Sequence, residues 1–206
     1  MKLWLLRSLR GLDEALRCSG FLPDFKRGEP APGIATNSSE DMINLASFKN
    51  SGFVRGAPKW KEAAWWVARS LFFAPSFPVP SKIKVILLRN FGAKIGEGVV
   101  IRSKVNITFP WRFECGDHVW IGDEVLILSL AQVTIGSNVC ISQRAFLCTG
   151  SHDFRKESFD LITKPIVIGG GCWVCAQAFV GPGVTLPAGT MVKAGEVFGK
   201  GSDGVR

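Results

Sequence analysis

The polar segment Gly150-Ser-His-Asp153 contains the side chain best suited to proton transfer, the imidazole of His152. An unperturbed histidine has a pKa of about 6.5, so near neutral pH it can take a proton from a hydroxyl group that attacks an electrophile. A histidine in a polar loop can also serve only to hydrogen-bond the loop backbone, and the residues alone leave both roles open. The other histidine, His118, lies in a regular stretch of sequence where we expect an outward-facing surface residue.

The six cysteines do not have the spacing of a metal site. Cys172 and Cys175 form a Cys-x-x-Cys pair, but a zinc site needs two more ligands nearby, and the chain has only two histidines. A redox pair of this type precedes a helix, which the surrounding sequence does not predict. Because Arg7 and Arg10 interrupt the apolar start of the chain, no signal peptide is predicted, and we expect reduced thiols, a cytoplasmic location and no metal.

The elements that must position His152 follow a repeat of six residues. From residue 93 onward an Ile, Val, Leu or Phe recurs every six positions, with a spacing of eight at two junctions. These positions are Ile95, Ile101, Ile107, Phe113, Ile121, Ile127, Ile135, Ile141, Leu147, Ile168, Val174, Val180, Leu186, Val192 and Phe198. The pattern is typical of a parallel β-helix, in which each hexad forms one short strand and one turn and three hexads close a triangular coil. Glycines beside several of these residues are expected where a side chain would clash or φ must be positive.

The repeat divides the chain into four parts. We expect a poorly ordered extension over residues 1–43, a helical cap over 44–92, the β-helix over 93–198 and an irregular tail over 199–206. The β-helix would have about five coils, and its open strand edges need covering, which the N-terminal helices could provide.

Two helices are predicted within the cap. The first spans residues 58–73 and carries several tryptophans, and the second spans 82–90 with Ser81 as its N-cap. The residues of the second helix expected to face inward are Ile83, Ile86 and Leu87.

Residues 148–166 interrupt the repeat with a polar segment. A long excursion from a regular solenoid is usually a binding or catalytic element. His152 stands at the base of this loop, where the rigid coil beneath could hold it while it faces a cleft.

The positive charge of the chain is concentrated before the repeat. The formal net charge is +8, and residues 42–104 hold 11 Lys and Arg against Glu62 and Glu97. The repeat half has no basic stripe interleaved with aromatic residues, so we expect no nucleic-acid partner. An anionic membrane surface or an anionic glycan carrier is the expected partner of residues 42–104. Such membrane contact would be peripheral, at the inner face of the membrane, because no apolar run reaches the roughly 18 residues that a spanning helix needs.

The hexad array and its loop resemble the hexapeptide-repeat O-acetyltransferases, and within them the colanic-acid and exopolysaccharide acetyltransferases. The stretches that carry this resemblance are Phe91–Gly96, Thr108–Trp111, Gly116–Asp123, Ile141–Asp153, Pro165–Gly169 and Cys172–Val174. The resemblance implies a left-handed parallel β-helix and a homotrimer with active sites between neighbouring chains. It also implies acetyl-CoA as co-substrate and a hydroxyl of a saccharide or lipid-linked glycan as acceptor, in exopolysaccharide biosynthesis.

The resemblance implies roles for individual residues. His152 matches the general base of the family. The residues that match the coenzyme A channel are Trp173, Ala176, Ala194, Gly195 and Lys200. Separately from the resemblance, we expect three polar residues on the coils or loop beside His152 to contact the acceptor: Asp123, Ser129 and Asp153.

The chain departs from the family pattern near its end. Lys193 stands where the family usually has glycine, and Glu196 stands where it has a small residue, at a corner where burial of a carboxylate would be costly. The Pro-containing tail of the family is replaced by residues 199–206. The alternative hypothesis is therefore a non-catalytic β-helix that has lost coenzyme A binding. Two other classes are disfavoured, because β-helical carbonic anhydrases need three histidines and sugar-nucleotide pyrophosphorylases need an α/β domain before the repeat.

Overall fold

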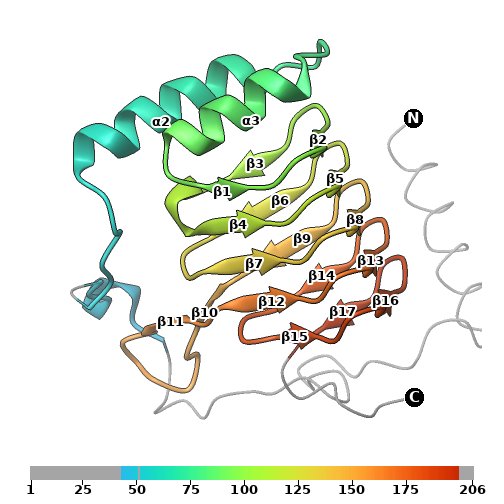
Figure 1. Cartoon of the computed structure of the whole chain (residues 1–206). Helices are drawn as coiled ribbons and strands as arrows, with labels where there is room; N and C mark the ends of the chain where they lie inside the picture. The colour runs from blue at the N-terminus through green and yellow to red at the C-terminus, as the bar shows by residue number, and fades with distance from the viewer. Residues whose placement is uncertain (1–42, 51, 200–206) are drawn as a thin grey trace, which may run out of the picture. The chain divides into compact units, whose positions relative to one another are not determined.

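The computed structural model describes residues 43–50 and 52–199, and these residues form a three-sided β-solenoid with two helices across one end (Figure 1). The predicted extension 1–43, apart from Ile43, and the predicted tail 199–206, apart from Gly199, lie outside the described residues. Among the described helices, none combines the length and the apolar character needed to cross a membrane.

Three parallel five-stranded sheets form the sides of the solenoid, so the prediction of about five coils is confirmed. The first face consists of β1 (Lys94–Ile95), β4 (Phe113–Cys115), β7 (Val133–Ile135), β12 (Ile166–Ile168) and β15 (Thr185–Leu186). The second face consists of β2 (Val100–Ile101), β5 (Trp120–Ile121), β8 (Cys140–Ile141), β13 (Trp173–Val174) and β16 (Met191–Val192). The third face consists of β3 (Asn106–Ile107), β6 (Leu126–Leu128), β9 (Phe146–Cys148), β14 (Phe179–Val180) and β17 (Val197–Phe198).

We call the turns from the first to the second face the first corner, those from the second to the third face the second corner, and those from the third face to the next coil the third corner. Two elements depart from the coils at the third corner: η2 (Pro110–Arg112) and the hairpin of β10 (Gly150–His152) with β11 (Leu161–Thr163). A short helix, η1 (Leu45–Ser47), precedes the cap. His118 is exposed at the first corner, as predicted.

The interior is a stack of the apolar hexad residues, with one correction at Phe113. In the strand register Ile95 lies beside Cys115 and Cys115 beside Ile135, so Cys115 occupies the position that the hexad spacing assigned to Phe113. Phe113 also points inward, but it pairs with Val133. The two extra residues at the junction lengthen the strand to three, and because side chains alternate along a strand both of its ends face the core.

The glycines beside the core residues are required by close packing rather than by a positive φ. A Cβ on Gly136 would lie 2.5 Å from the amide nitrogen of Gly170 in the next coil, so no side chain fits there. Left-handed φ values occur instead at the corner turns. Along the second corner they are adopted by Lys104, Glu124, Arg144, Gln177 and Gly195, with φ between 57° and 70°.

Two helices, α2 (Lys59–Phe72) and α3 (Ser81–Asn90), cover the first coil and supply hydrogen bonds to its open strand edge. The indole Nε1 of Trp65 donates to the carbonyl of Ile107 at 2.9 Å, and the guanidinium of Arg89 donates to the carbonyl of Ile95 at 2.7 Å. Within the described residues no coil precedes these strands, so the helices satisfy backbone groups that would otherwise lack partners.

α3 also supplies hydrogen bonds to the strand of the first coil on the second face, and this corrects the role expected of Ser81. Ser81 does not cap its helix; its hydroxyl accepts from the amide of Ile101 at 3.0 Å and donates to the carbonyl of the same residue at 3.2 Å. Lys84 is only 1% exposed, and its Nζ donates to the carbonyl of Arg102 at 2.6 Å. Burial lowers the pKa of Lys84, and Arg102 lowers it further, although the carboxylate of Asp123 acts in the opposite direction.

The inward face of α3 also differs from the prediction. Ile83 and Ile86 are 41% and 56% exposed, and Leu87 is only half-buried. The helix is rotated because the strand edge beneath it requires donors and acceptors rather than aliphatic groups. The residues that face the solenoid are Lys84, Val85 and Leu88.

Candidate active site

His152 is held at the base of a hairpin that projects from the third corner. It ends β10, where it lies opposite Leu161 of the antiparallel strand β11. The hairpin leaves the solenoid after β9 and returns at β12, so two rigid strands fix both of its ends. The excursion predicted over 148–166 is therefore formed by this hairpin and its tip.

The ring of His152 is oriented by the backbone and the ring of Phe159. Nδ1 lies 2.8 Å from the carbonyl oxygen of Phe159, and the two rings stack with centroids 4.3 Å apart at an interplanar angle of 3°. A carbonyl oxygen can only accept a hydrogen bond, so Nδ1 carries the proton in the neutral ring. Nε2 is then left with its lone pair free to accept a proton from a substrate.

Two aromatic residues of this site, Phe48 and Phe159, were not identified from the sequence. Phe48 contacts the ring of His152 edge-on at 5.6 Å. Phe159 adopts φ +48°, a left-handed conformation that is rare for a large side chain and that places its carbonyl toward His152. The signal in the sequence that could have pointed to Phe159 is its place in a polar hairpin, two residues before the second strand.

The segment 43–57 runs beside the hairpin and the third corner (Figure 1). The amide of Asn44 donates to the carbonyl of Glu157 at 2.9 Å. Farther along the segment, the rings of Phe53 and Phe109 stack with their centroids 6.4 Å apart. The segment thus joins the histidine loop to the first coil and covers one side of His152.

Four charged side chains at the hairpin tip form two ion pairs. The Asp153 carboxylate lies 3.3 Å from Nε of Arg155, and Lys156 binds Asp160 at 2.9 Å. The hydrogen bond from Lys156, together with one from Ser158, lowers the pKa of the Asp160 carboxyl. Asp153, which follows His152 in the chain, is half-buried.

The structure brings together three of the residues assigned to coenzyme A. Ala176 and Ala194–Gly195 occupy successive turns of the second corner, and the amide of Gly195 donates to the carbonyl of Ala176 at 2.9 Å. Trp173 lies on the second face, half exposed, with its indole Nε1 donating to the hydroxyl of Ser142 at 2.8 Å. Lys200 lies outside the described residues.

The departures at Lys193 and Glu196 fall in the same turn of the second corner. The carboxylate of Glu196 is half-buried and accepts a hydrogen bond from the amide of Lys193 at 2.7 Å. It therefore closes the turn around Ala194–Gly195 and does not carry the burial cost that the sequence suggested.

Two of the residues assigned to the acceptor are engaged elsewhere in the chain. Ser129 is fully buried, and its hydroxyl both donates to the carbonyl and accepts from the amide of Phe109. Asp123 lies in a turn of the second corner, whereas His152 follows the third face. Burial alone would raise the pKa of Asp123, but the amide of Ser103 and the guanidinium of Arg102 hold it below its ordinary value.

Within one chain, His152 and the residues expected to bind coenzyme A therefore lie at different corners of the prism. His152 projects from the third corner, and Ala176 with Gly195 lie at the second corner.

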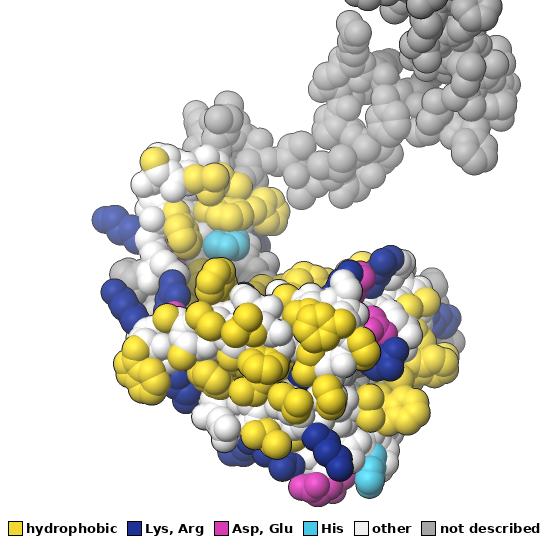
Figure 2. Space-filling model, turned by 90° about the horizontal axis from the view of Figure 1, so that it is seen from above, with side chains coloured by type: hydrophobic (Ala, Val, Ile, Leu, Met, Phe, Trp, Pro, Cys, Tyr) yellow, Lys and Arg dark blue, Asp and Glu magenta, His cyan; other side chains and the backbone are white. Residues whose placement is uncertain are grey.

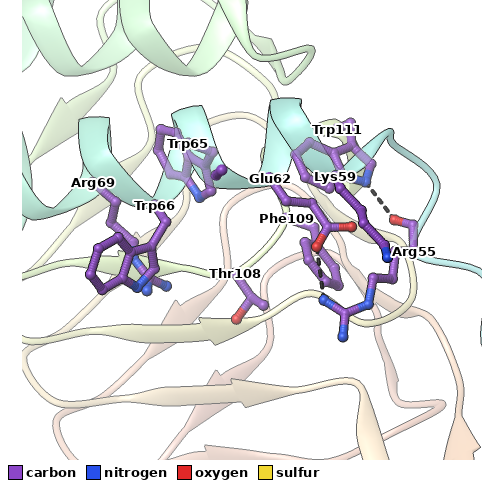
Figure 3. Close-up of a pocket in the computed structure, with 10 residues that line it drawn as sticks. Arg55, Lys59, Glu62, Trp65, Trp66, Arg69, Thr108, Phe109 and Trp111 are labelled. Carbon is purple, nitrogen blue, oxygen red and sulfur yellow. Dashed lines mark hydrogen bonds and ion pairs between the residues drawn. The ribbon is translucent and has the colours of Figure 1, made fainter. Parts of the chain in front are cut away.

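A cavity of about 430 Å³ lies between α2 and the turn that follows β3, at the same corner as the hairpin (Figure 3). Trp66, Arg69 and Thr108 line one end of it. At the other end Arg55 binds the Glu62 carboxylate at 2.8 Å. An aromatic ring beside cationic and hydroxyl groups suits a sugar that carries a negative charge.

The cysteines and carboxylates do not form a metal centre in the part of the chain described. Within residues 43–50 and 52–199, no group of three or more His, Cys, Asp or Glu side chains is placed to hold a metal ion. Cys172 is buried, with its thiol donating to the carbonyl of Pro187 at 3.0 Å, which is a packing role.

Comparison with known proteins places this arrangement among acetyltransferases. The chain is 44% identical over 153 residues to WcaF of Escherichia coli (strain K12), named for colanic acid biosynthesis, covering 74% of this chain and 84% of the relative. It is 26% identical over 132 residues to the galactoside O-acetyltransferase of the same strain, covering 62% of this chain and 64% of that protein. No protein-family model matches the chain.

A solved structure shares the fold. It is the hexapeptide-repeat acetyltransferase of Vibrio cholerae O1 biovar eltor in complex with acetyl coenzyme A, with a TM-score of 0.62 at 23% identity. The likeness covers 77% of this chain and 85% of that one. A structural likeness at 23% sequence identity supports the fold, the left-handed β-helix predicted from the sequence.

Proposed function

Because the chain belongs to the hexapeptide-repeat acetyltransferases, we propose that it moves the acetyl group of acetyl-CoA to a hydroxyl group of a saccharide in exopolysaccharide biosynthesis. The observation that carries the proposal is the orientation of His152, whose Nδ1 is tied to the carbonyl of Phe159 at 2.8 Å. That bond leaves Nε2 as the proton acceptor on a ring that the hairpin and Phe159 hold in place.

The proposed reaction proceeds in one transfer with both substrates bound. Nε2 of His152 takes the proton of the acceptor hydroxyl as its oxygen attacks the carbonyl carbon of the thioester. The bond between that carbon and the coenzyme A sulfur breaks, and the proton passes from His152 to the leaving sulfur. The products are the O-acetyl sugar and free coenzyme A. No acyl-enzyme is formed, so both substrates must be bound together. Their alignment by the protein supplies much of the rate enhancement.

The proposed site lies between chains of a homotrimer. Its support is the separation of His152 from the Ala176–Gly195 corner within one chain, together with the half-exposed ring of Trp173 on the second face, which ends at that corner. Trp173, Ala176, Ala194, Gly195 and Lys200 of one chain would then bind coenzyme A beside His152 of its neighbour. Asp123, which shares the second corner, could reach an acceptor only by the same route.

The acceptor is proposed to approach along the third corner, as a free saccharide or a lipid-linked glycan. Asp153 stands beside His152, and the aromatic and basic cavity at Trp66 lies farther along the same corner. The side chain of Ser129 is already bonded at both its donor and acceptor positions, so we assign it to holding the turn at Phe109.

Replacement of His152 tests the function. His152→Ala should lower the turnover number for acetyl transfer at least about 100-fold, measured as coenzyme A thiol released with an oligosaccharide panel as acceptor. His118→Asn is the matched control, because His118 is exposed at the first corner and asparagine tolerates its φ of +55°. Unchanged turnover in His152→Ala would reject the assignment.

Calorimetry with coenzyme A separates the enzyme from a non-catalytic β-helix. One feature favours the alternative, a non-catalytic β-helix: the Glu196 carboxylate accepts the hydrogen bond of the Lys193 amide at the corner proposed to bind coenzyme A. Micromolar binding of coenzyme A to the intact protein would reject the non-catalytic reading, and absence of both binding and acetyl transfer would support it.

A further inference from the structure

The two cap helices turn a row of apolar side chains away from the solenoid. On α2, Trp60, Val67 and Leu71 are spaced seven and four residues apart, so they share one side of the helix, turned away from the buried Trp65. On α3, Ile83 and Ile86 face outward, and Phe77 projects from the connection between the helices. We call this set the cap face: Trp60, Val67, Leu71, Phe77, Ile83 and Ile86, which are between 41% and 71% exposed.

The fold itself does not need these side chains to be apolar. The contacts that join the helices to the first coil are made from their other side, by Trp65, Lys84 and Arg89 among others. Seen from the capped end, hydrophobic side chains cover the middle of the molecule and Lys and Arg stand mostly at the margins (Figure 2). A gathered apolar area of this kind on a soluble-protein surface usually marks a contact with another phase or molecule.

The charge around the cap face is predominantly positive, although Arg89 of α3 is paired with Glu97 at 3.0 Å. Between residues 43 and 96 the sequence has nine Lys and Arg and a single acidic residue, Glu62. The carboxylate of Glu62 is already paired with Arg55 at 2.8 Å. Lys59 and Lys82 are exposed, and each is the immediate neighbour of a cap-face residue, Trp60 and Ile83 respectively.

We propose that the cap face binds the surface of an anionic lipid bilayer, with the apolar side chains in the headgroup region and the basic side chains on lipid phosphates. Amphipathic helices with tryptophan and aliphatic residues on one side and lysines beside them bind in this way. Contact is at the surface only, because no described helix is fit to span a membrane. A bilayer matches both properties at once, whereas a second cap face would bring like charges together.

The proposal has a geometric consequence for the proposed function but does not depend on it. The helices close one end of the solenoid, and the hairpin of His152 projects from its side (Figure 1). With the cap face on a bilayer, the third corner would stand beside the membrane, within reach of a glycan attached to a lipid.

Vesicle flotation with the full chain tests the proposal. The protein should float with vesicles of phosphatidylcholine containing about 30% phosphatidylglycerol and bind vesicles of phosphatidylcholine alone far more weakly. The double variant Leu71→Gln, Ile86→Gln should lower the partition coefficient at least about tenfold. Val54→Gln is the matched control, since Val54 is 74% exposed but lies outside both helices.

The basic contribution is tested separately. Lys59→Gln with Lys82→Gln should lower binding to anionic vesicles about 25-fold, on the basis of a factor of about five for each cation, and should leave binding to neutral vesicles unchanged. Lys193→Gln, an exposed lysine in the last coil, should bind as the unaltered protein does.

Several results would overturn the proposal. It fails if the protein does not float, or if the cap-face variants, with unchanged thermal midpoints, float as well as the unaltered protein. It also fails if sedimentation shows that the variants instead lose a self-association seen without lipid. Acetyl transfer to a soluble saccharide should be the same in the cap-face variants, so vesicle binding without transfer would reject the proposed function alone.

Discussion

Phe159 offers a way to separate the orientation of His152, the proposed catalytic base, from the stability of its loop. Its ring stacks on His152 at 4.3 Å, its carbonyl accepts a hydrogen bond from Nδ1, and its backbone has φ +48°. Phe159→Ala removes the ring but keeps the carbonyl and the left-handed backbone. Phe159→Gly also removes the ring, but glycine adopts this backbone without a steric penalty.

The structure sets the size of the two effects. A stacked aromatic pair is worth about 0.5 to 1.5 kcal/mol beyond its buried area, so loss of the stack should lower the turnover number about two- to tenfold in both variants. The carbonyl bond remains, which is why the loss is smaller than that expected for His152→Ala. The left-handed backbone costs alanine about 1 to 2 kcal/mol, and the greater chain entropy of unfolded glycine offsets about half of that. Phe159→Gly should therefore be more stable than Phe159→Ala by about 0.5 to 1 kcal/mol.

The assay needs both kinetics and denaturation. The turnover number is measured by thiol release at saturating acetyl-CoA, and the free energy of unfolding by urea titration of the same preparations. The Michaelis constant for acetyl-CoA should not change, because Phe159 acts through His152. Wild-type turnover in both variants would show that the ring does not orient the base. A glycine variant less stable than the alanine variant would refute the argument from backbone strain.

Two further predictions follow from the cap and from the corners. Lys84→Met should lower the free energy of unfolding by about 1 to 3 kcal/mol in urea titrations, because the carbonyl of Arg102 loses its donor. Burial lowers the pKa of Lys84 in the folded chain, so as pH rises toward about 10.4 the folded chain loses the Lys84 proton before the unfolded chain does. The stability of the unaltered protein relative to the variant should therefore rise over that interval. A pH-independent difference would contradict this. Mixed oligomers refolded from equal amounts of His152→Ala and Gly195→Trp chains should recover about a quarter of the unaltered activity, because about one site in four then pairs an intact histidine with an intact corner. Recovery of none would place the whole site within one chain.

The parts of the fold that could be predicted from the sequence are those governed by a local period. The inward stack from Ile95 to Phe198 follows from the hexad spacing, because each coil repeats the same contacts with the next. Where a strand gains residues the period alone fails, as at Phe113 and Cys115, since both then face inward and only the register with the neighbouring coil tells them apart.

The candidate site was partly predictable because one of its segments interrupts this local period. His152 could be found because the polar segment breaks a regular pattern. Phe48 and Phe159 could not, because their contacts with His152 depend on how segment 43–57 and the hairpin tip fold back on the ring. The separation of the two proposed substrate corners is likewise a property of the closed coil and not of any local motif.

The error in the orientation of α3 links the architecture to the proposed membrane contact. An amphipathic reading places Ile83 and Ile86 inward, since a helix usually packs its apolar side on the core. Here the core offers a strand edge with unpaired carbonyls and amides, and Ser81, Lys84 and Arg89 satisfy it. Polar side chains on the outside would cost this packing nothing, because the helix is already held by its inner side. The exposed Ile83 and Ile86, together with the exposed Leu71 and Trp60 of α2, are therefore the residues on which the proposed membrane contact rests.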